Sequence, residues 1–105
     1  MILLINPFTV VENREPEFLR LWDQTNAIFQ SCPGYISARL AKASERQAPG
    51  QAAPFTHVNV AEWSSRDTYA AALKNGQLGR LVPLYDEVST FSPALYHIIR
   101  ETISE

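Results

Sequence analysis

The chain has 105 residues, a formal net charge of −2 and 46% hydrophobic residues, which together predict one globular domain over residues 1–105. Its nine basic residues are scattered, so neither a nucleic-acid nor a membrane partner is expected, and no apolar run approaches the length of a membrane span. The single cysteine, Cys32, cannot form an internal disulfide, so no oxidising compartment is implied and a cytoplasmic location is expected.

The first predicted elements are a strand over residues 1–11 and a helix over residues 13–31. Apolar residues occupy both faces of the strand as far as Asn6, and Pro7 then indicates an edge position or a point where main-chain pairing lapses. The helix has Pro16 in its first turn, where the missing N–H is harmless, and carries a buried stripe at helical spacing. The stripe consists of Phe18, Leu21, Trp22, Thr25, Ile28, Phe29 and Cys32.

Two further strands are predicted over residues 35–43 and 56–63, joined by a polar, proline-containing loop over residues 44–54. Alternation in the later strand places four side chains on one face: His57, Asn59, Ala61 and Trp63. Asn59 is unusual in mid-strand, because Asn is disfavoured there and a buried amide must be hydrogen-bonded. If the protein has a polar pocket, we expect this face to line it.

A second helix is predicted to follow that strand. Ser64 or Ser65 caps it, and Asp67 stands at a capping-box-like spacing from Ser64. The pair Asn75 and Gly76 is expected to end it.

The rest of the chain predicts a short helix over residues 77–89, in which Pro83 favours a kink or an early end. A linker over residues 90–93 leads to a final strand over residues 94–100. A frayed tail is expected over residues 101–105.

This order of elements predicts an α+β, ferredoxin-like βαββαβ fold, with an antiparallel four-stranded sheet and helices on one face. The helices can cover only that face, yet apolar Val58 and Val60 oppose Asn59 and Trp63 on the third strand. A bare apolar face would be a large exposed patch, so we expect a homodimer in which two copies pack sheet against sheet.

Four segments of the chain resemble the antibiotic biosynthesis monooxygenase family of dimeric α+β barrels. They are INPFTV at 5–10, SCPGYISARL at 31–40, FTHVNVAEWSS at 55–65 and SPALYHIIRE at 92–101. The resemblance covers nearly the whole chain and implies that the sheet and its copy form a dimeric α+β barrel.

The resemblance also implies a set of pocket residues. In the cofactor-independent, quinone-forming monooxygenases of this family, an Asn, a Trp four residues later and a Tyr six residues after that line the substrate pocket. Asn59, Trp63 and Tyr69 match that spacing. Those enzymes also use an Arg further along, but here the nearest basic residue is Arg80, and Pro83 stands about where the Arg would align.

The haem-degrading branch of the family implies a different set. It pairs an Asn on the first strand with this Trp and with a His on the following helix. Asn6 and Trp63 match two of these positions, but Leu73 and its neighbours supply no histidine. A haem-ligand role is therefore not expected.

The sequence has no cofactor motif, because its glycines at 34, 50, 76 and 79 form no dinucleotide fingerprint and its two histidines and one cysteine show no zinc spacing. We therefore expect no metal or organic cofactor. An electron-rich phenol or enol, once deprotonated, can pass an electron directly to dioxygen, so the protein needs only to bind it, stabilise the anion and exclude water.

The residues that would do this are hydrogen-bond donors in an apolar pocket. We predict Asn59, Trp63 and Tyr69 as catalytic residues. The predicted substrate-binding residues are Asn6, Trp22, His57, Arg80 and His97. The expected reaction is the oxidation of a small aromatic or polyketide-like phenol by dioxygen.

Two alternatives are open. The first is a non-catalytic dimeric barrel that binds a small apolar molecule, which the missing Arg favours. The second is an isomerase or lyase of the same superfamily that acts on a small acid, with His57 or His97 as its base. Trp63 also has a plainer interpretation as a core residue, and Asn59 as a structural cross-strand amide.

Overall fold

The structure, a computed structural model, describes residues 1–104; residue 105, the last of the predicted tail and domain, lies outside the described residues. The elements follow in the order β1 (Ile2–Val10), α1 (Glu15–Gln30), β2 (Tyr35–Lys42), β3 (His57–Trp63), α2 (Arg66–Ala72), α3 (Gly76–Val88), β4 (Ser89–Phe91) and β5 (Ala94–Tyr96). No helix in residues 1–104 is long and apolar enough to cross a membrane.

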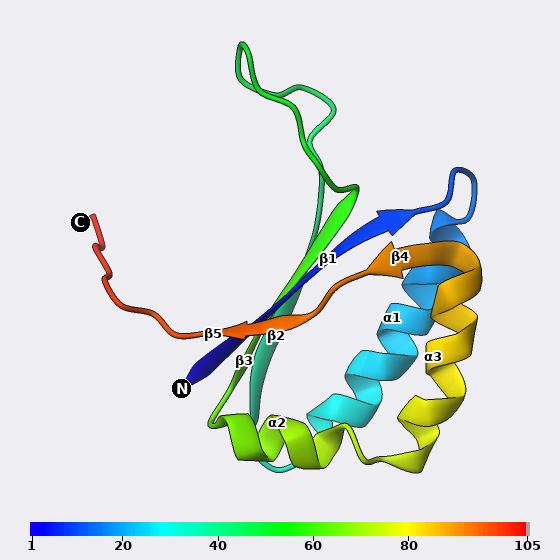
Figure 1. Ribbon diagram of the computed structural model, residues 1–105, viewed down its shortest axis with the longest axis vertical. Coiled ribbons are helices and arrows are strands. Elements are labelled where there is room, and N and C mark those ends of the chain that lie inside the picture. Colours follow the sequence, from blue (N-terminus) through cyan, green and yellow to red (C-terminus); the bar gives the residue numbers. More distant parts are fainter. Residues whose placement is uncertain (105) are drawn as a thin grey trace.

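The sheet is antiparallel, with strand order β2-β3-β1-β4 and with β5 also paired to β1. The helices α1, α2 and α3 lie on one side of this sheet (Figure 1). The predicted α+β, ferredoxin-like fold is therefore confirmed. The pairing of two such sheets in a homodimer stays a prediction.

The strands β4 and β5 are two parts of one interrupted strand. Both pair with β1 in the same register, β4 with its end and β5 with its start. The pairing lapses opposite Asn6 and Pro7, where neither Pro7 nor Pro93 has an N–H to donate. Asn6 compensates, because its Oδ1 accepts a hydrogen bond from the Ser92 backbone N–H at 3.2 Å. The predicted lapse of pairing at Pro7 is thus confirmed, on the side of β1 that faces this broken strand.

The end of the chain differs from the prediction in two ways. Residues 90–93, predicted as a linker, include part of β4. The final strand ends at Tyr96 instead of residue 100, because Tyr96 pairs with Leu3 and β1 begins at Ile2. Residues 98–104 therefore lie beyond the start of β1, and residues 97–104 lead away from the body of the molecule (Figure 1).

The cap of α2 is also different in detail. Ser65 is the N-cap, and its Oγ accepts from the Thr68 backbone N–H at 3.1 Å while Thr68 Oγ1 accepts from the Ser65 N–H at 3.3 Å. The capping box is therefore closed by Thr68 instead of Asp67, because Thr68 is the third helical residue when counted from Ser65.

The predicted helix end at Asn75 is a helix start. Asn75 is the N-cap of α3, and its Oδ1 accepts from the Gln77 backbone N–H at 2.8 Å. The helix then continues through Pro83 to Val88 without an early end. Leu78 before the proline and Val88 after it are both buried, so core packing holds the helix on both sides of the missing hydrogen bond.

The core between sheet and helices forms two clusters of buried side chains. One consists of Phe8, Val10, Phe18, Leu21, Tyr85 and Val88. The other consists of Ile2, Leu4, Ala61, Trp63 and Ala72. On the opposite face of the sheet no described helix covers the apolar side chains, and Val60 and Tyr96 are exposed there.

Candidate functional site

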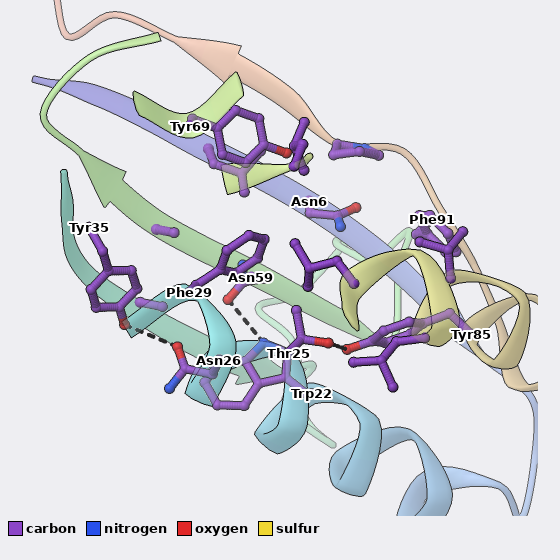
Figure 2. Close-up of a pocket in the computed structure, with 18 of the residues that line it drawn as sticks. Asn6, Trp22, Thr25, Asn26, Phe29, Tyr35, Asn59, Tyr69, Tyr85 and Phe91 are labelled. Atoms are coloured by element: carbon purple, nitrogen blue, oxygen red, sulfur yellow. Dashed lines mark hydrogen bonds between the residues drawn. The ribbon is translucent and has the colours of Figure 1, made fainter. Parts of the chain in front are cut away.

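A cavity of about 240 Å³ lies between the sheet and the helices (Figure 2). Side chains of both core clusters line it, including Phe8 and Tyr85 from one and Leu4 and Trp63 from the other. The lining is mostly apolar, and within the described part of the chain it includes no Asp, Glu, Lys, Arg or His side chain. A cavity of this kind suits a flat, largely apolar ligand that carries a few polar groups.

Five of the eight predicted site residues line this cavity. They are Asn6, Trp22, Asn59, Trp63 and Tyr69. Asn6 and Asn59 are direct cross-strand partners in the pairing of β1 with β3, so their amides are neighbours on the same face of the sheet. Trp22 reaches the cavity from α1 and Tyr69 from α2. The roles of these residues stay predictions, but the fold does bring them together.

Both asparagine amides have a fixed orientation. The Trp22 indole N–H donates to Asn59 Oδ1 at 3.2 Å, and the Ser92 backbone N–H donates to Asn6 Oδ1 at 3.2 Å. An N–H group can only donate, so each amide must present its oxygen to that partner. The NH₂ group of each amide has no hydrogen-bond partner among residues 1–104 and is available to a ligand.

Trp63 is fully buried, and its Nε1 has no hydrogen-bond partner in the described structure. Its ring packs edge-on against Phe29, Tyr35 and Tyr69, at centroid distances of 5.3, 5.6 and 5.6 Å. A buried donor without a partner costs about 1–3 kcal/mol. The Trp63 side chain also lines the cavity.

The hydroxyl of Tyr85, which lines the cavity, acts as a donor. Thr25 Oγ1 donates to the Leu21 carbonyl at 2.8 Å, so the 2.7 Å contact between Tyr85 and Thr25 is a bond in which the Tyr85 hydroxyl donates (Figure 2). Burial raises the pKa of Tyr85 to about 12 and also raises the pKa of Tyr69. Both phenols therefore keep their protons at neutral pH, and neither serves as a base there.

His57 shares a strand face with Asn59, as predicted, but does not line the cavity. It is buried at the start of β3, where Nε2 lies 2.7 Å from Glu15 Oε2 and Nδ1 lies 2.9 Å from Thr56 Oγ1. Hydrogen bonds from Lys42 and from His57 hold the pKa of the Glu15 carboxyl below its usual value. Both ring nitrogens are thus occupied, Nε2 by Glu15 of α1 and Nδ1 by the adjacent Thr56, and neither is free to contact a ligand.

Arg80 and His97 also lie outside the cavity. Arg80 is exposed on α3, whose cavity side is formed by Leu78, Leu81, Val82 and Tyr85. His97 is exposed just beyond the end of β5. Pro83 is exposed as well, so no residue at the aligned position replaces the missing Arg.

The sequence matches no family model and no curated protein. Solved structures do match it. An antibiotic biosynthesis monooxygenase of known structure aligns with a TM-score of 0.76 at 17% identity, over 95% of this chain and 100% of that chain. This chain has the antibiotic biosynthesis monooxygenase fold.

Two further structures with this fold extend the comparison. SnoaB, a cofactor-independent oxygenase from Streptomyces nogalater, is 24% identical with a TM-score of 0.81, over 99% of this chain and 97% of that chain. A proposed monooxygenase from Shewanella loihica PV-4 is 26% identical with a TM-score of 0.71, over 95% of each chain. The antibiotic biosynthesis monooxygenase fold therefore spans nearly the whole chain.

Within this monooxygenase fold, the cavity does not fit the haem-degrading branch. Asn6 and Trp63 line it, but neither His57 nor His97 does, and Leu73 occupies the rim. No imidazole among the described residues is placed to bind an iron atom there.

Several cavity residues were missed in the sequence. Asn26, Tyr35 and Tyr85 line the cavity, and the Tyr35 hydroxyl donates to Asn26 Oδ1 at 3.0 Å (Figure 2). One signal was available: Trp22, Thr25, Asn26 and Phe29 follow helical spacing, so polar groups interrupt an otherwise buried stripe. Tyr85 also gave a signal, because it follows the helical spacing of Leu78, Leu81 and Val82, which line the cavity with it, whereas Tyr35 gave none.

Proposed function

We propose that this protein is a cofactor-independent monooxygenase that oxidises an aromatic, polyketide-like phenol with dioxygen. The observation that carries the proposal is an apolar cavity whose free polar groups are donors and whose described lining has no charged side chain. The fold it shares with SnoaB, which is described as a cofactor-independent oxygenase, supports the same reaction class.

The proposed reaction converts a ring CH₂ group to a carbonyl. The substrate loses one proton to solvent at the cavity entrance, and its bound anion passes one electron to dioxygen to give a carbon radical and superoxide. Recombination forms a C–O bond, and protonation followed by loss of water breaks the O–O bond and the second C–H bond. The substrate thus supplies all four electrons, keeps one oxygen atom and releases the other as water.

In this reaction the protein binds and stabilises the anion. The Asn59 amide NH₂, the Trp63 indole N–H and the Tyr69 hydroxyl donate to the substrate oxygen on which negative charge accumulates. Asn6 adds a second amide NH₂ beside that of Asn59. The apolar walls exclude water, which strengthens these hydrogen bonds.

Oxygen consumption tests the proposal directly. The purified protein, stripped of metal, is incubated under air with a panel of anthrones and naphthols. We expect uptake above autoxidation, and we expect Trp63→Phe to reduce it about tenfold or more, because the variant keeps an aromatic ring but loses the donor. Uptake that Trp63→Phe leaves unchanged would contradict the assigned role of Trp63.

A second candidate is a non-catalytic barrel that binds an apolar aromatic molecule, and the absence of Arg from the described lining favours it. Trp22 and Trp63 both line the cavity, so a bound aromatic compound should quench tryptophan fluorescence saturably. Quenching by the same panel without oxygen uptake would select this function. The isomerase or lyase alternative needed His57 or His97 as base, and neither lines the cavity, so we do not propose it.

A further inference from the structure

The geometry points to Trp22 as the positioning residue that orients the Asn59 amide toward the ligand. The inference deepens the proposed function and rests on it for the identity of the ligand. It starts from one contact that crosses the cavity, the 3.2 Å hydrogen bond from Trp22 Nε1 on α1 to Asn59 Oδ1 on β3 (Figure 2).

An asparagine amide has two ends of similar shape and opposite character. If the Asn59 amide rotates by half a turn, it presents a carbonyl oxygen where it had presented NH₂. The carbonyl oxygen repels a phenolate, whereas the NH₂ group attracts it. The indole N–H of Trp22 cannot accept a hydrogen bond, so it favours only the orientation in which Asn59 directs its oxygen to α1 and its NH₂ elsewhere.

No other bond on the described residues orients this amide. Asn59 Nδ2 has no partner among residues 1–104, and the neighbouring amide of Asn6 is held separately by the Ser92 backbone N–H. Backbone holds one amide of the pair and a side chain holds the other. A side-chain substitution at Trp22 can therefore release the Asn59 amide without changing the sheet, whereas the Asn6 amide is held by backbone.

Trp22 also forms part of the cavity wall, so its loss has two separable effects. Trp22→Phe keeps an aromatic wall but removes the donor together with part of the ring, and the double-mutant cycle below separates these two effects. Thr25→Val is the matched control, because Thr25 lies one turn later on α1, lines the same cavity and bonds to Tyr85 instead of Asn59.

NMR spectroscopy of the full, ligand-free chain tests the orientation itself. In Trp22→Phe we expect the Asn59 side-chain NH₂ signals to shift or broaden, while those of Asn6 keep their positions. In Asn59→Ala we expect the Trp22 indole N–H to exchange with solvent at least about tenfold faster. Unchanged Asn59 signals in Trp22→Phe would overturn the inference, whether or not the protein is an oxygenase.

A double-mutant cycle tests the consequence for binding. The probe is a hydroxyanthraquinone, which belongs to the product class and can be titrated without turnover. We expect Trp22→Phe to weaken binding about tenfold when Asn59 is present and less than twofold in Asn59→Ala. Thr25→Val should have the same effect in both backgrounds.

The outcomes are distinguishable. An equal loss of binding from Trp22→Phe in both backgrounds would show a wall effect and overturn the positioning role. If the wild-type protein neither consumes oxygen nor binds the probe, the proposed function fails, and the NMR measurement alone decides whether Trp22 orients Asn59.

Discussion

In the proposed reaction, Asn59 is the residue on which stabilisation of the substrate anion depends most. It combines a mid-strand position, a cross-strand partner in Asn6 and an oxygen held by Trp22, so its NH₂ group is the end left for a ligand. Trp63, four residues later on the same face of β3, adds a buried N–H without a partner. Two donors with unmet hydrogen-bonding capacity on one strand face indicate a site for an oxygen atom that carries negative charge.

Substitution of Asn59 tests this at the residue scale. Asn59→Asp keeps the shape and can still accept from Trp22, but it replaces the donor with a second, negatively charged oxygen. We expect it to reduce oxygen uptake more than Asn59→Ala does, and we expect Asn59→Ala to reduce it at least about tenfold. Circular dichroism checks that both variants are folded. Asn59→Asp with near wild-type turnover would show that the amide does not stabilise an anion.

At the scale of elements, the start of α1 is bound to the sheet through Glu15. Its carboxylate contacts Lys42 of β2 at 2.9 Å and buried His57 of β3 at 2.7 Å. The hydrogen bonds from Lys42 and His57 favour the charged carboxylate, which explains the lowered pKa of Glu15. Because α1 also carries Trp22, this contact helps to set the distance between that helix and Asn59.

The lowered pKa makes this contact sensitive to acid. A carboxyl whose pKa is lower in the folded state stabilises the fold above its unfolded pKa, here 4.5, and that stability is lost as the pH falls through the folded pKa. We expect the free energy of unfolding in urea to fall as the pH is lowered below about 4.5. Glu15→Gln should flatten this dependence. An equally steep dependence in Glu15→Gln would assign it to other carboxyl groups.

At the scale of the whole molecule, the sheet has two unlike faces. One is covered by the three helices and encloses the cavity, while the other exposes Val60 and Tyr96 (Figure 1). Residues 97–104 lead away from the sheet, and Ile99 is exposed. We propose that a second copy covers the open face, because a contiguous apolar surface of this kind is uncommon on a monomer.

Sedimentation analysis tests the proposed dimer. We expect the wild-type chain to sediment as a dimer and Val60→Glu to sediment as a folded monomer, because the charge would be buried at the interface. Leu84→Glu is the control, since Leu84 on α3 is 43% exposed and Val60 is 36% exposed, and it should leave the dimer intact. A wild-type monomer at micromolar concentration would contradict the proposal.

The sequence by itself determined the elements whose signals are local. Alternation predicted β3 and the shared face of Asn59 and Trp63, and helical spacing predicted α1. The capping pair of α2 was predicted one residue before its true position at Ser65 and Thr68. Pro7 marked the lapse in pairing because a proline has no backbone N–H to donate, whatever fold surrounds it.

Only the tertiary structure decided the rest. It continued α3 through Pro83, because buried side chains on both sides outweigh one missing hydrogen bond. It placed His57 in a contact with Glu15 and brought Trp22 to Asn59 across 37 positions of the chain. Such contacts depend on which helix packs over which strand. A local pattern of residues does not show which distant segments of the chain will meet.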